Sequence, residues 1–245
     1  MTLKTKLTDL FKHRVLEPQL DRQERWEQMV IDIPDAVRGS EDSPIRFNIP
    51  RAGIELEGDH APLPGFPKSA PQMMGSILNI RKSIYDLEKN PAKGKRQIDA
   101  PRLVDLRDFS RSVGADEIGF APAPPKWVFR NLAIRYTQAI VLVMEMDKAR
   151  MQLAPNPDTA VMVHETYNQL GQVANQIADW LRDHGYAAHA GHPLGGFALY
   201  PPMAQAAGLG WRGISGLLIT PQFGPRVRLA AVFTEIENLP VYEGN

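Results

Sequence analysis

The most informative segment of the chain runs from residue 207 to residue 234 and reads Ala207-Gly-Leu-Gly-Trp-Arg-Gly-Ile-Ser-Gly-Leu-Leu-Ile-Thr-Pro-Gln-Phe-Gly-Pro-Arg-Val-Arg-Leu-Ala-Ala-Val-Phe-Thr234. Its apolar runs predict strands over 217–220 and 227–233, joined at 221–225 by a hairpin or a tight excursion. A short helix is predicted just before it, over 201–207. Four glycines therefore lie between a helix and a strand, where their backbone can approach a flat or bulky ligand and offer N–H donors to it.

The order of these features argues against two nucleotide-binding patterns. A dinucleotide fold places G-x-G-x-x-G after a strand and at the start of a helix, which is the reverse of the order here. The phosphate-binding pattern G-x-x-x-x-G-K-[ST] is absent from the sequence. The glycine-rich segment thus indicates a ligand site of another kind.

The segments that precede it predict an α+β protein. The apolar run 139–144 has the length of a buried strand. The strongest helical pattern begins at Glu165 or Thr166, repeats apolar residues every three or four positions, and stops at Gly185. The other predicted elements are helices over 72–88 and 103–113 and strands over 116–121 and 186–189.

The first hundred residues are less regular. Residues 1–70 show no clear periodicity, and 35–71 is rich in proline, glycine and charge, as in a long arm that wraps a core. We expect an N-terminal arm and helix over 1–100 and a core domain over 101–245.

Composition excludes several classes of protein. Hydrophobic residues make up 43% of the 245 residues, which is enough for a sizeable core. Lys+Arg and Asp+Glu both number 28, so a chain without net charge gives no broad reason to bind nucleic acid. No apolar run reaches the roughly 18 residues of a membrane span, and no signal sequence is apparent, so we expect a cytoplasmic protein. Because the chain has no cysteine, it offers no disulfide and no thiolate ligand for zinc or an iron–sulfur cluster.

Four segments in the same order resemble the reductive dehalogenases and the related epoxyqueuosine reductases. The longest is the glycine-rich segment, continued to Leu239-Pro240. The strand ending in Glu145-Met-Asp147 also matches, as do 166–170, which resembles the helix start that carries the family's tyrosine, and 178–187, which resembles a helix end and the next strand. The resemblance covers roughly residues 100 to 240.

This resemblance implies a nitroreductase-like mixed sheet flanked by helices, which holds base-off cobalamin above a buried substrate pocket. The implied chemistry is the reductive removal of a halide or a similar leaving group. Cobalamin supplies that chemistry, while the protein supplies position, exclusion of water and a proton.

The resemblance assigns the proton to Tyr167, assisted by a nearby lysine or arginine. A phenol with an ordinary pKa of about 10 is a poor acid–base group without such a cation. The family's basic residue matches Ile214 here, so Arg212 or another cation takes its place, or the pair is incomplete. Alternatively, Tyr167 is an aromatic anchor with its hydroxyl bonded to backbone.

Cobalamin contacts are implied for the glycine-rich segment. Trp211 lies either against the corrin or in the core. Arg226 and Arg228 lie two positions apart on a predicted strand, so they point the same way. They either hold the phosphate and amide tail of the cofactor or form an exposed basic edge. The full set of expected contacts is Gly208, Leu209, Gly210, Trp211, Gly213, Gly216, Thr220, Phe223, Gly224, Arg226 and Arg228.

No metal site is predicted from the histidines. His164, His184, His189 and His192 lie close together in sequence, but their spacing does not match that of paired ligands on one helical face or across strands. The resemblance implies that cobalt is bound without a histidine ligand.

The missing cysteines leave several hypotheses open. In the family, a ferredoxin-like segment with two cluster motifs follows the strand that ends near Leu239-Pro240, whereas this sequence ends at Asn245. Electrons then come from another protein, or the sequence is a piece of a longer chain, or the corrinoid is bound without turnover.

Our first hypothesis is a cobalamin-binding reductive dehalogenase-like oxidoreductase with a small-molecule substrate and an external, ferredoxin-like electron donor. The alternatives are a non-catalytic corrinoid-binding subunit or carrier paired with such a partner, and a relative of flavin-dependent nitroreductases. Neither nucleic acid nor a membrane is expected as a partner, and a homodimer is left open.

Overall fold

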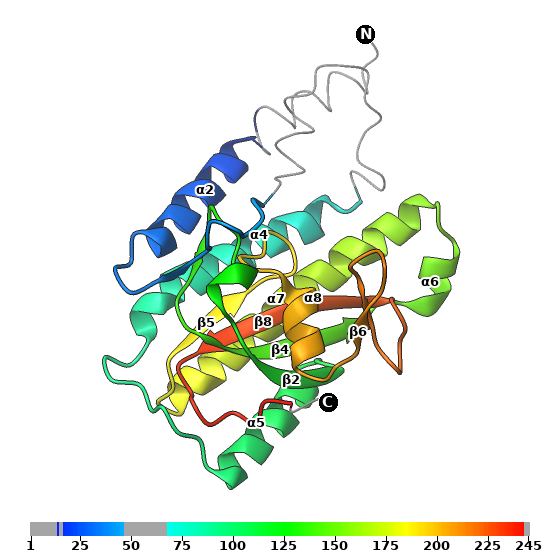
Figure 1. Cartoon of the computed structure of the whole chain (residues 1–245). Coiled ribbons are helices and arrows are strands. Elements are labelled where there is room, and N and C mark those ends of the chain that lie inside the picture. The colour runs from blue at the N-terminus through cyan, green and yellow to red at the C-terminus, as the bar shows by residue number, and fades with distance from the viewer. Residues whose placement is uncertain (1–13, 15–16, 47–67, 243–245) are drawn as a thin grey trace.

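The computed structural model describes residue 14 and residues 17–46 and 68–242 (Figure 1). Its helices are α2 (Glu17–Ile31), α4 (Ala70–Tyr85), α5 (Ala100–Ser112), α6 (Lys148–Gln152), α7 (Pro157–Asp183) and α8 (Tyr200–Ala206), with 3-10 turns at Asp86–Lys89 and Pro125–Trp127. Its strands are β1 (Val37–Arg38), β2 (Glu117–Pro122), β3 (Ala133–Ile134), β4 (Gln138–Glu145), β5 (Ala188–Gly191), β6 (Trp211–Arg212), β7 (Leu218–Ile219) and β8 (Val227–Thr234).

The central sheet has four strands in the order β2-β4-β8-β5. Every pair in it is antiparallel, so the expectation of a mixed sheet is wrong for the described residues, although the α+β class is confirmed. Since β4 lies between two strands and both of its faces are covered, six consecutive residues of it are buried. That double coverage explains the continuous apolar run in the sequence.

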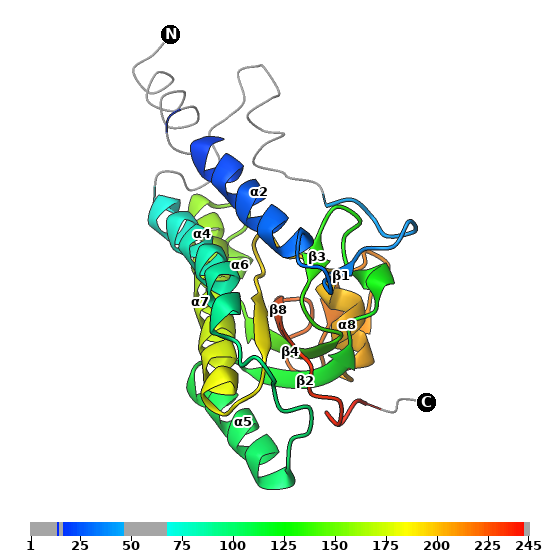
Figure 2. The same ribbon diagram turned by 90° about the vertical axis from the view of Figure 1, so that its left-hand side faces the viewer.

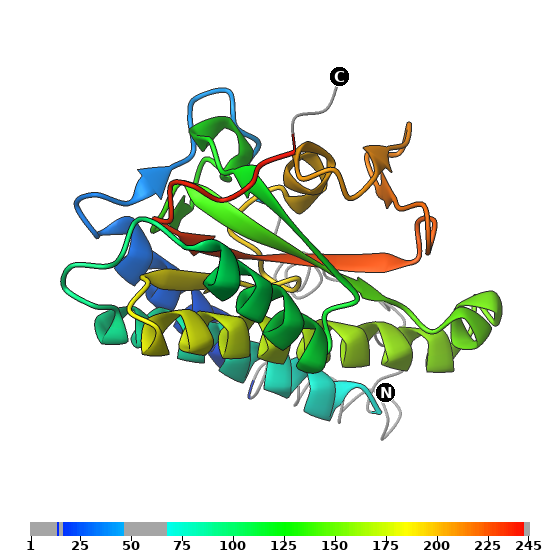
Figure 3. The same ribbon diagram turned by 90° about the horizontal axis from the view of Figure 1, so that it is seen from below.

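Helices cover the two faces of the sheet in different ways (Figure 3). The long helix α7 runs along one face with α4 and α5 beside it, whereas α8 and the β6–β7 ribbon lie over the other face. Alternate residues of β8 therefore enter different cores: Val232 packs with the apolar side of α7, and Phe233 packs with α8.

Helix α7 begins earlier than its periodicity predicts. It starts at Pro157, and the side chain of Asn156 caps it by accepting a hydrogen bond from the backbone N–H of Asp158 at 2.8 Å. The predicted start at Glu165 or Thr166 is therefore wrong. The predicted end is confirmed, because Gly185 has a φ of +85° directly after the last turn.

Helix α2 lies in the region for which no regular element was predicted, so that prediction is wrong for residues 17–31. Its buried face consists of Leu20, Gln23, Glu27 and Val30, at helical spacing. Two of these four side chains are polar, which hides the period in a hydrophobicity pattern. The helix packs on α4 and β3 (Figure 2).

The glycine-rich segment forms a separate ribbon. β7 pairs with β6 and not with β8, so a hairpin between the two predicted strands is wrong. The tight excursion is confirmed, because Thr220 and Gly224 bridge to each other across 221–223. The predicted strand over 186–189 is shifted to Ala188–Gly191.

Residues on both sides of the predicted domain boundary share one core. Val30 and Ile80 belong to the same buried cluster as Val141 and Phe233. The division at residue 100 stays a prediction, and the parts of the predicted arm at 1–13, 15–16 and 47–67 lie outside the described residues. Within the described ranges, no helix has the length and apolarity needed to cross a membrane.

Candidate functional site

The candidate site lies where α7 meets β8. Tyr167 is on α7, and Arg228 is on β8 with its side chain on the face of the sheet that α7 covers. The Cζ atom of Arg228 lies 4.6 Å from the centroid of the Tyr167 ring, which is a close cation–π contact. Both side chains are partly exposed. The sequence places these residues far apart, and the sheet brings them together.

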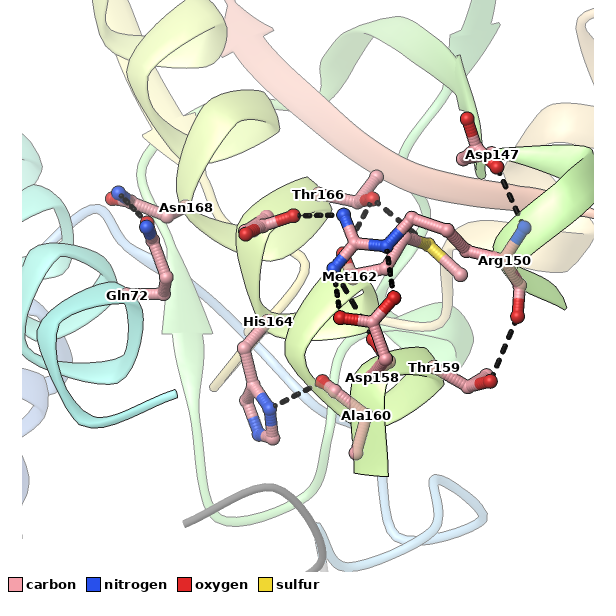
Figure 4. Close-up of polar contacts among 11 residues, drawn as sticks. Gln72, Asp147, Arg150, Asp158, Thr159, Ala160, Met162, His164, Thr166 and Asn168 are labelled. Atoms are coloured by element: carbon pink, nitrogen blue, oxygen red, sulfur yellow. Dashed lines mark hydrogen bonds and ion pairs between the residues drawn. The ribbon is translucent and has the colours of Figure 1, made fainter. Parts of the chain in front are cut away.

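His164 joins this pair from the preceding turn of α7. Its ring lies edge-on to Tyr167, with 6.3 Å between the centroids. Its Nδ1 donates to the carbonyl oxygen of Ala160 at 2.8 Å (Figure 4). Burial is the largest effect on the pKa of His164 and lowers it; the bond to Ala160 opposes burial, and the nearby charge of Arg228, the smallest of the three effects, lowers the pKa further. The imidazole is therefore held neutral beside the tyrosine.

A polar stripe continues along the same face of α7. His164, Tyr167, Gly171 and Asn175 are spaced three or four residues apart, so they lie one above another. Gly171 makes room for a buried side chain, because a Cβ atom there would lie 3.0 Å from Nδ1 of His192. Asn175 donates to the carbonyl oxygen of Asn79 on α4 at 3.1 Å, whereas its own Oδ1 has no hydrogen-bond partner.

His192 is buried beside this stripe. It is 2% exposed, neither ring nitrogen has a hydrogen-bond partner, and burial lowers its pKa from 6.5 to about 3. It follows directly on β5, which pairs with only the second half of β8. In the described part of the chain, residues 227–230 of β8 therefore have no strand on that side.

Two more buried polar groups lie at this end of β5. His189 accepts a hydrogen bond from the backbone N–H of Arg135 at its Nδ1, so its proton is on Nε2, which has no partner. Burial lowers the pKa of His189 to about 3 and raises the pKa of Tyr200. A Cβ atom at Gly191 would lie 2.6 Å from the Tyr200 hydroxyl oxygen, which shows how tightly this tyrosine is enclosed.

The first turns of α7 are fixed by Arg150 (Figure 4). Its Nε atom is 3.0 Å from Oδ2 of Asp158, and its Nη1 atom bonds Glu165. Its backbone N–H donates to Oδ1 of Asp147 at 2.7 Å. One arginine thus ties α6 to the part of α7 that carries His164 and Tyr167.

Arg212 does not lie with Tyr167. It is exposed on the β6–β7 ribbon, where its backbone N–H and its Nε both donate to Oε1 of Gln205, at 3.1 and 3.2 Å. Arg226 pairs with Glu145 and the carbonyl oxygen of Met146, so the two arginines expected to hold a phosphate have different partners. Of Arg212, Arg226 and Arg228, it is Arg228 that contacts Tyr167 in the structure.

The ribbon presents apolar side chains outward. Trp211 and Leu217 are 55% and 54% exposed, and Ile214 is fully exposed. Trp211 therefore does not fill the core. Gly216 has a φ of +79° and no heavy atom within 4 Å of an added Cβ, so the space beside its Cα is open, while its N–H donates to the carbonyl oxygen of Gly213 at 2.9 Å.

Other predicted contact residues already have structural partners. Leu209 is buried in the core, and a Cβ at Gly208 would lie 2.7 Å from the ring of Tyr242. Thr220 closes the turn through bonds with the backbone of Phe223 and Gly224. The remaining two positions expected to contact cobalamin, Gly210 and Gly213, lie against Ile219. These cofactor contacts stay predictions.

The sequence drew attention to His189 and His192 only as possible metal ligands, and it did not predict that they and Tyr200 are buried. His192, His189 and Tyr200 carry no motif, and their relation to α7 depends on where β5 ends. The glycines at 191, 195 and 196 are the only local signal of a closely packed loop. Among the described residues, no group of three or more His, Cys, Asp or Glu side chains is arranged to hold a metal ion.

Curated proteins with similar sequences are reductive dehalogenases, whereas no family model matches the chain. The tetrachloroethene reductive dehalogenase of Dehalobacter restrictus is 37% identical over 137 residues, which are 56% of this chain and 24% of that protein. The enzyme of the same name from Sulfurospirillum multivorans is 33% identical over 101 residues, 41% of this chain and 20% of that one. The chain thus spans at most 24% of the length of these relatives.

Solved structures give the same relationship at the level of the fold. NpRdhA, a catabolic reductive dehalogenase in complex with 3-bromo-4-hydroxybenzoic acid, superposes with a TM-score of 0.56 at 17% identity, covering 71% of this chain and 28% of its own. A reductive dehalogenase structure described as suggesting a mechanism for B12-dependent dehalogenation gives a TM-score of 0.52 at 17% identity and covers 69% of this chain and 28% of its own.

Proposed function

We propose that this chain, which is reductive dehalogenase-like in sequence and in fold, is part of an oxidoreductase that replaces a carbon–halogen bond with a carbon–hydrogen bond. The step consumes two electrons and one proton and releases a halide ion. The observation that carries the proposal is the 37% identity over 137 residues to a tetrachloroethene reductive dehalogenase. The contact between Tyr167 and Arg228 supports it, because it joins a phenolic proton donor to a cation.

The ribbon has features that fit a corrinoid cofactor. Trp211, Ile214 and Leu217 are exposed apolar side chains of one ribbon, and exposed apolar area that gathers in one place often marks a binding surface. A flat corrin would cover these side chains, and the open space beside Gly216 would let it approach the backbone closely. When bound, cobalamin would supply the low-potential electron chemistry that no side chain provides. We propose that it is held in the base-off form.

The chain's own residues would hold the substrate and move the proton. Tyr167 would carry the proton at its hydroxyl oxygen, and Arg228 would keep a positive charge beside the ring. His164 stays neutral and so adds no further charge to the pair. Because the 245 residues contain no cysteine, the electrons would reach the site from outside this sequence, and we propose a ferredoxin-like donor for them.

Halide release tests the proposal. The protein is loaded with hydroxocobalamin, reduced with Ti(III) citrate, and given tetrachloroethene or 3-bromo-4-hydroxybenzoic acid. We expect chloride or bromide to appear in step with the hydrogen-substituted product. The variant Tyr167→Phe should lower this rate by roughly 10²- to 10⁴-fold, the usual contribution of a general acid.

Two outcomes would contradict the proposal. Corrinoid binding without halide release, even with the strong reductant, would identify a corrinoid-binding subunit or carrier. A bound yellow chromophore instead of a corrinoid would identify a flavin-dependent protein.

A further inference from the structure

We infer that Arg46 is a positioning residue: together with Glu27 it holds the loop 192–196 against helix α7, where the loop closes one side of the candidate site. The effect on turnover rests on the proposed function, whereas the placement of the loop does not. The inference follows from the bonds of Arg46, from the few bonds that hold the loop, and from the place of His192 at its start.

Arg46 is fixed by Glu27 of α2. Its Nη1 and Nη2 atoms donate to Oε1 and Oε2 of Glu27 at 2.9 and 2.8 Å, which makes a bidentate pair. The two side chains are 13% and 5% exposed, so water competes little for these bonds. Gln23, one turn earlier on α2, donates to Oε1 of Glu27 at 2.8 Å. The guanidinium is therefore held in one orientation relative to α2.

The same guanidinium reaches the loop. Nη1 of Arg46 also donates to the carbonyl oxygen of Gly195 at 3.0 Å. Within residues 17–46 and 68–242, no other hydrogen bond is made to residues 192–196. Two of these five residues, Gly195 and Gly196, are glycines, which gain the most conformational freedom when a backbone is released. The bond from Arg46 is thus the polar contact that keeps this loop in place.

The loop carries His192 to α7. Nδ1 of His192 lies 3.0 Å from the position of a Cβ atom at Gly171, which is one turn after Tyr167. The ring is 2% exposed and neither of its nitrogens has a hydrogen-bond partner. A buried imidazole without partners gains by reaching water, so the ring does not hold the loop closed by itself. Arg46 supplies the restraint that the ring lacks.

Exclusion of water is what a closed loop contributes to the proposed reaction. Water beside Tyr167 would compete for its hydroxyl proton and screen the charge of Arg228. The segment that contains α2 and Arg46 would thus complete a site whose chemical groups come from α7 and β8. Arg46 acts through the loop and not on the reacting atoms.

Arg38 offers a matched control in the same segment. Its guanidinium also donates to backbone carbonyl oxygens, those of Ile31 and Ile33, at 2.5 and 3.0 Å. These acceptors lie at and just after the end of α2 and not in the 192–196 loop. Arg38→Met therefore removes a contact of the same kind without releasing the loop.

An NMR titration of His192 in the protein without corrinoid tests the placement of the loop. In the wild type, the pKa of His192 is about 3, so its ring should not titrate between about pH 5 and 8. In Arg46→Met, the ring should reach water and titrate with a pKa near 6.5. Arg46→Lys keeps a charge opposite Glu27, and with it the fold, but lacks the fork that also reaches Gly195, so His192 should titrate there too. Arg38→Met should behave as the wild type.

Halide release separates the role in the site from the placement of the loop. We expect Arg46→Met and Arg46→Lys to lower kcat by up to about 10²-fold, the loss that a small misplacement remote from the chemistry can cause, and Arg38→Met to keep the wild-type rate. If the wild-type protein released no halide, the proposed function would fail, while the titration would still decide the placement of the loop. A His192 ring that does not titrate in either folded Arg46 variant would overturn the placement. Full activity of a variant in which His192 titrates would overturn the role in the site.

Discussion

The guanidinium of Arg228 lies over the ring of Tyr167, with Cζ 4.6 Å from the ring centroid, so a strand and a helix together build one cation–tyrosine pair. Helix α7 contributes Tyr167 and His164 from adjacent turns, and β8 contributes the charge. His164 reports on that charge, because Arg228 lowers its pKa.

Removing the charge should therefore raise the pKa of His164. In Arg228→Met, one of the two effects that lower this pKa disappears, while the larger one, burial, remains. The pKa of His164 should move upward but stay below 6.5. An NMR titration of the imidazole measures this pKa. The control is Arg107→Met, which removes a similar cation–π contact, 4.7 Å from Arg107 Cζ to the ring centroid of Phe120, on α5 and β2. An unchanged pKa in Arg228→Met would show that the guanidinium does not lie near His164.

Much of this fold follows from periodicity, but the site does not. The buried run of β4 and the apolar side of α7 are readable because both elements bury a regular pattern. Helix α2 is missed because Gln23 and Glu27 occupy half of its buried face. The contact of Tyr167 with Arg228 depends on which face of β8 is turned to α7, and no local pattern encodes that.

The buried histidines should make stability depend on pH. In the folded protein, burial lowers the pKa of both His189 and His192 from 6.5 to about 3. Between these values the unfolded chain binds more protons than the folded one. The contribution of the two neutral histidines to the free energy of unfolding is therefore fully present above pH 6.5 and decreases as the pH falls. Each histidine should contribute a slope of about 1.4 kcal/mol per pH unit.

Urea denaturation at several pH values measures this slope. We expect His192→Gln and His189→Gln each to reduce the pH slope of the free energy of unfolding by the contribution of one histidine. Tyr200→Phe changes the same buried region without removing a histidine, so its slope should match that of the wild type. A wild-type slope that persists in the His189→Gln, His192→Gln double variant would contradict the assignment.

A larger side chain in place of Gly171 should clash with the buried ring of His192 and destabilise the protein. A Cβ at Gly171 would already lie 3.0 Å from Nδ1 of His192 and 3.3 Å from Nδ2 of Asn79. Gly171→Val should therefore destabilise the protein by roughly 1–3 kcal/mol, the usual cost of overpacking. The control is Gln172→Val, at an exposed position of the same helix, which should cost less than about 1 kcal/mol. Equal melting temperatures for the two variants would show that His192 does not pack on Gly171.

The exposed apolar side chains of the β6–β7 ribbon should contribute to corrinoid affinity and only little to the free energy of unfolding. Ile214 and Leu217 bury little area, so replacing both with serine should change the free energy of unfolding by no more than about 0.5 kcal/mol per site. Covering such side chains with a cofactor is worth about 1.5–3 kcal/mol each, so the Kd for cobalamin should rise at least about 10-fold. Val104→Ser, at a 56% exposed position on α5, should leave the Kd unchanged. A Kd that rises equally in the Val104 variant would argue against the ribbon as the binding surface.

Corrinoid stoichiometry tests the central claim most directly. The protein is incubated with hydroxocobalamin, separated from free cofactor by gel filtration, and its visible absorption spectrum is compared with the protein concentration. A reductive dehalogenase-like protein that uses cobalamin should retain about one corrinoid per chain, and this should fall sharply in the Ile214→Ser, Leu217→Ser variant. Elution of all the corrinoid apart from the protein would contradict the account.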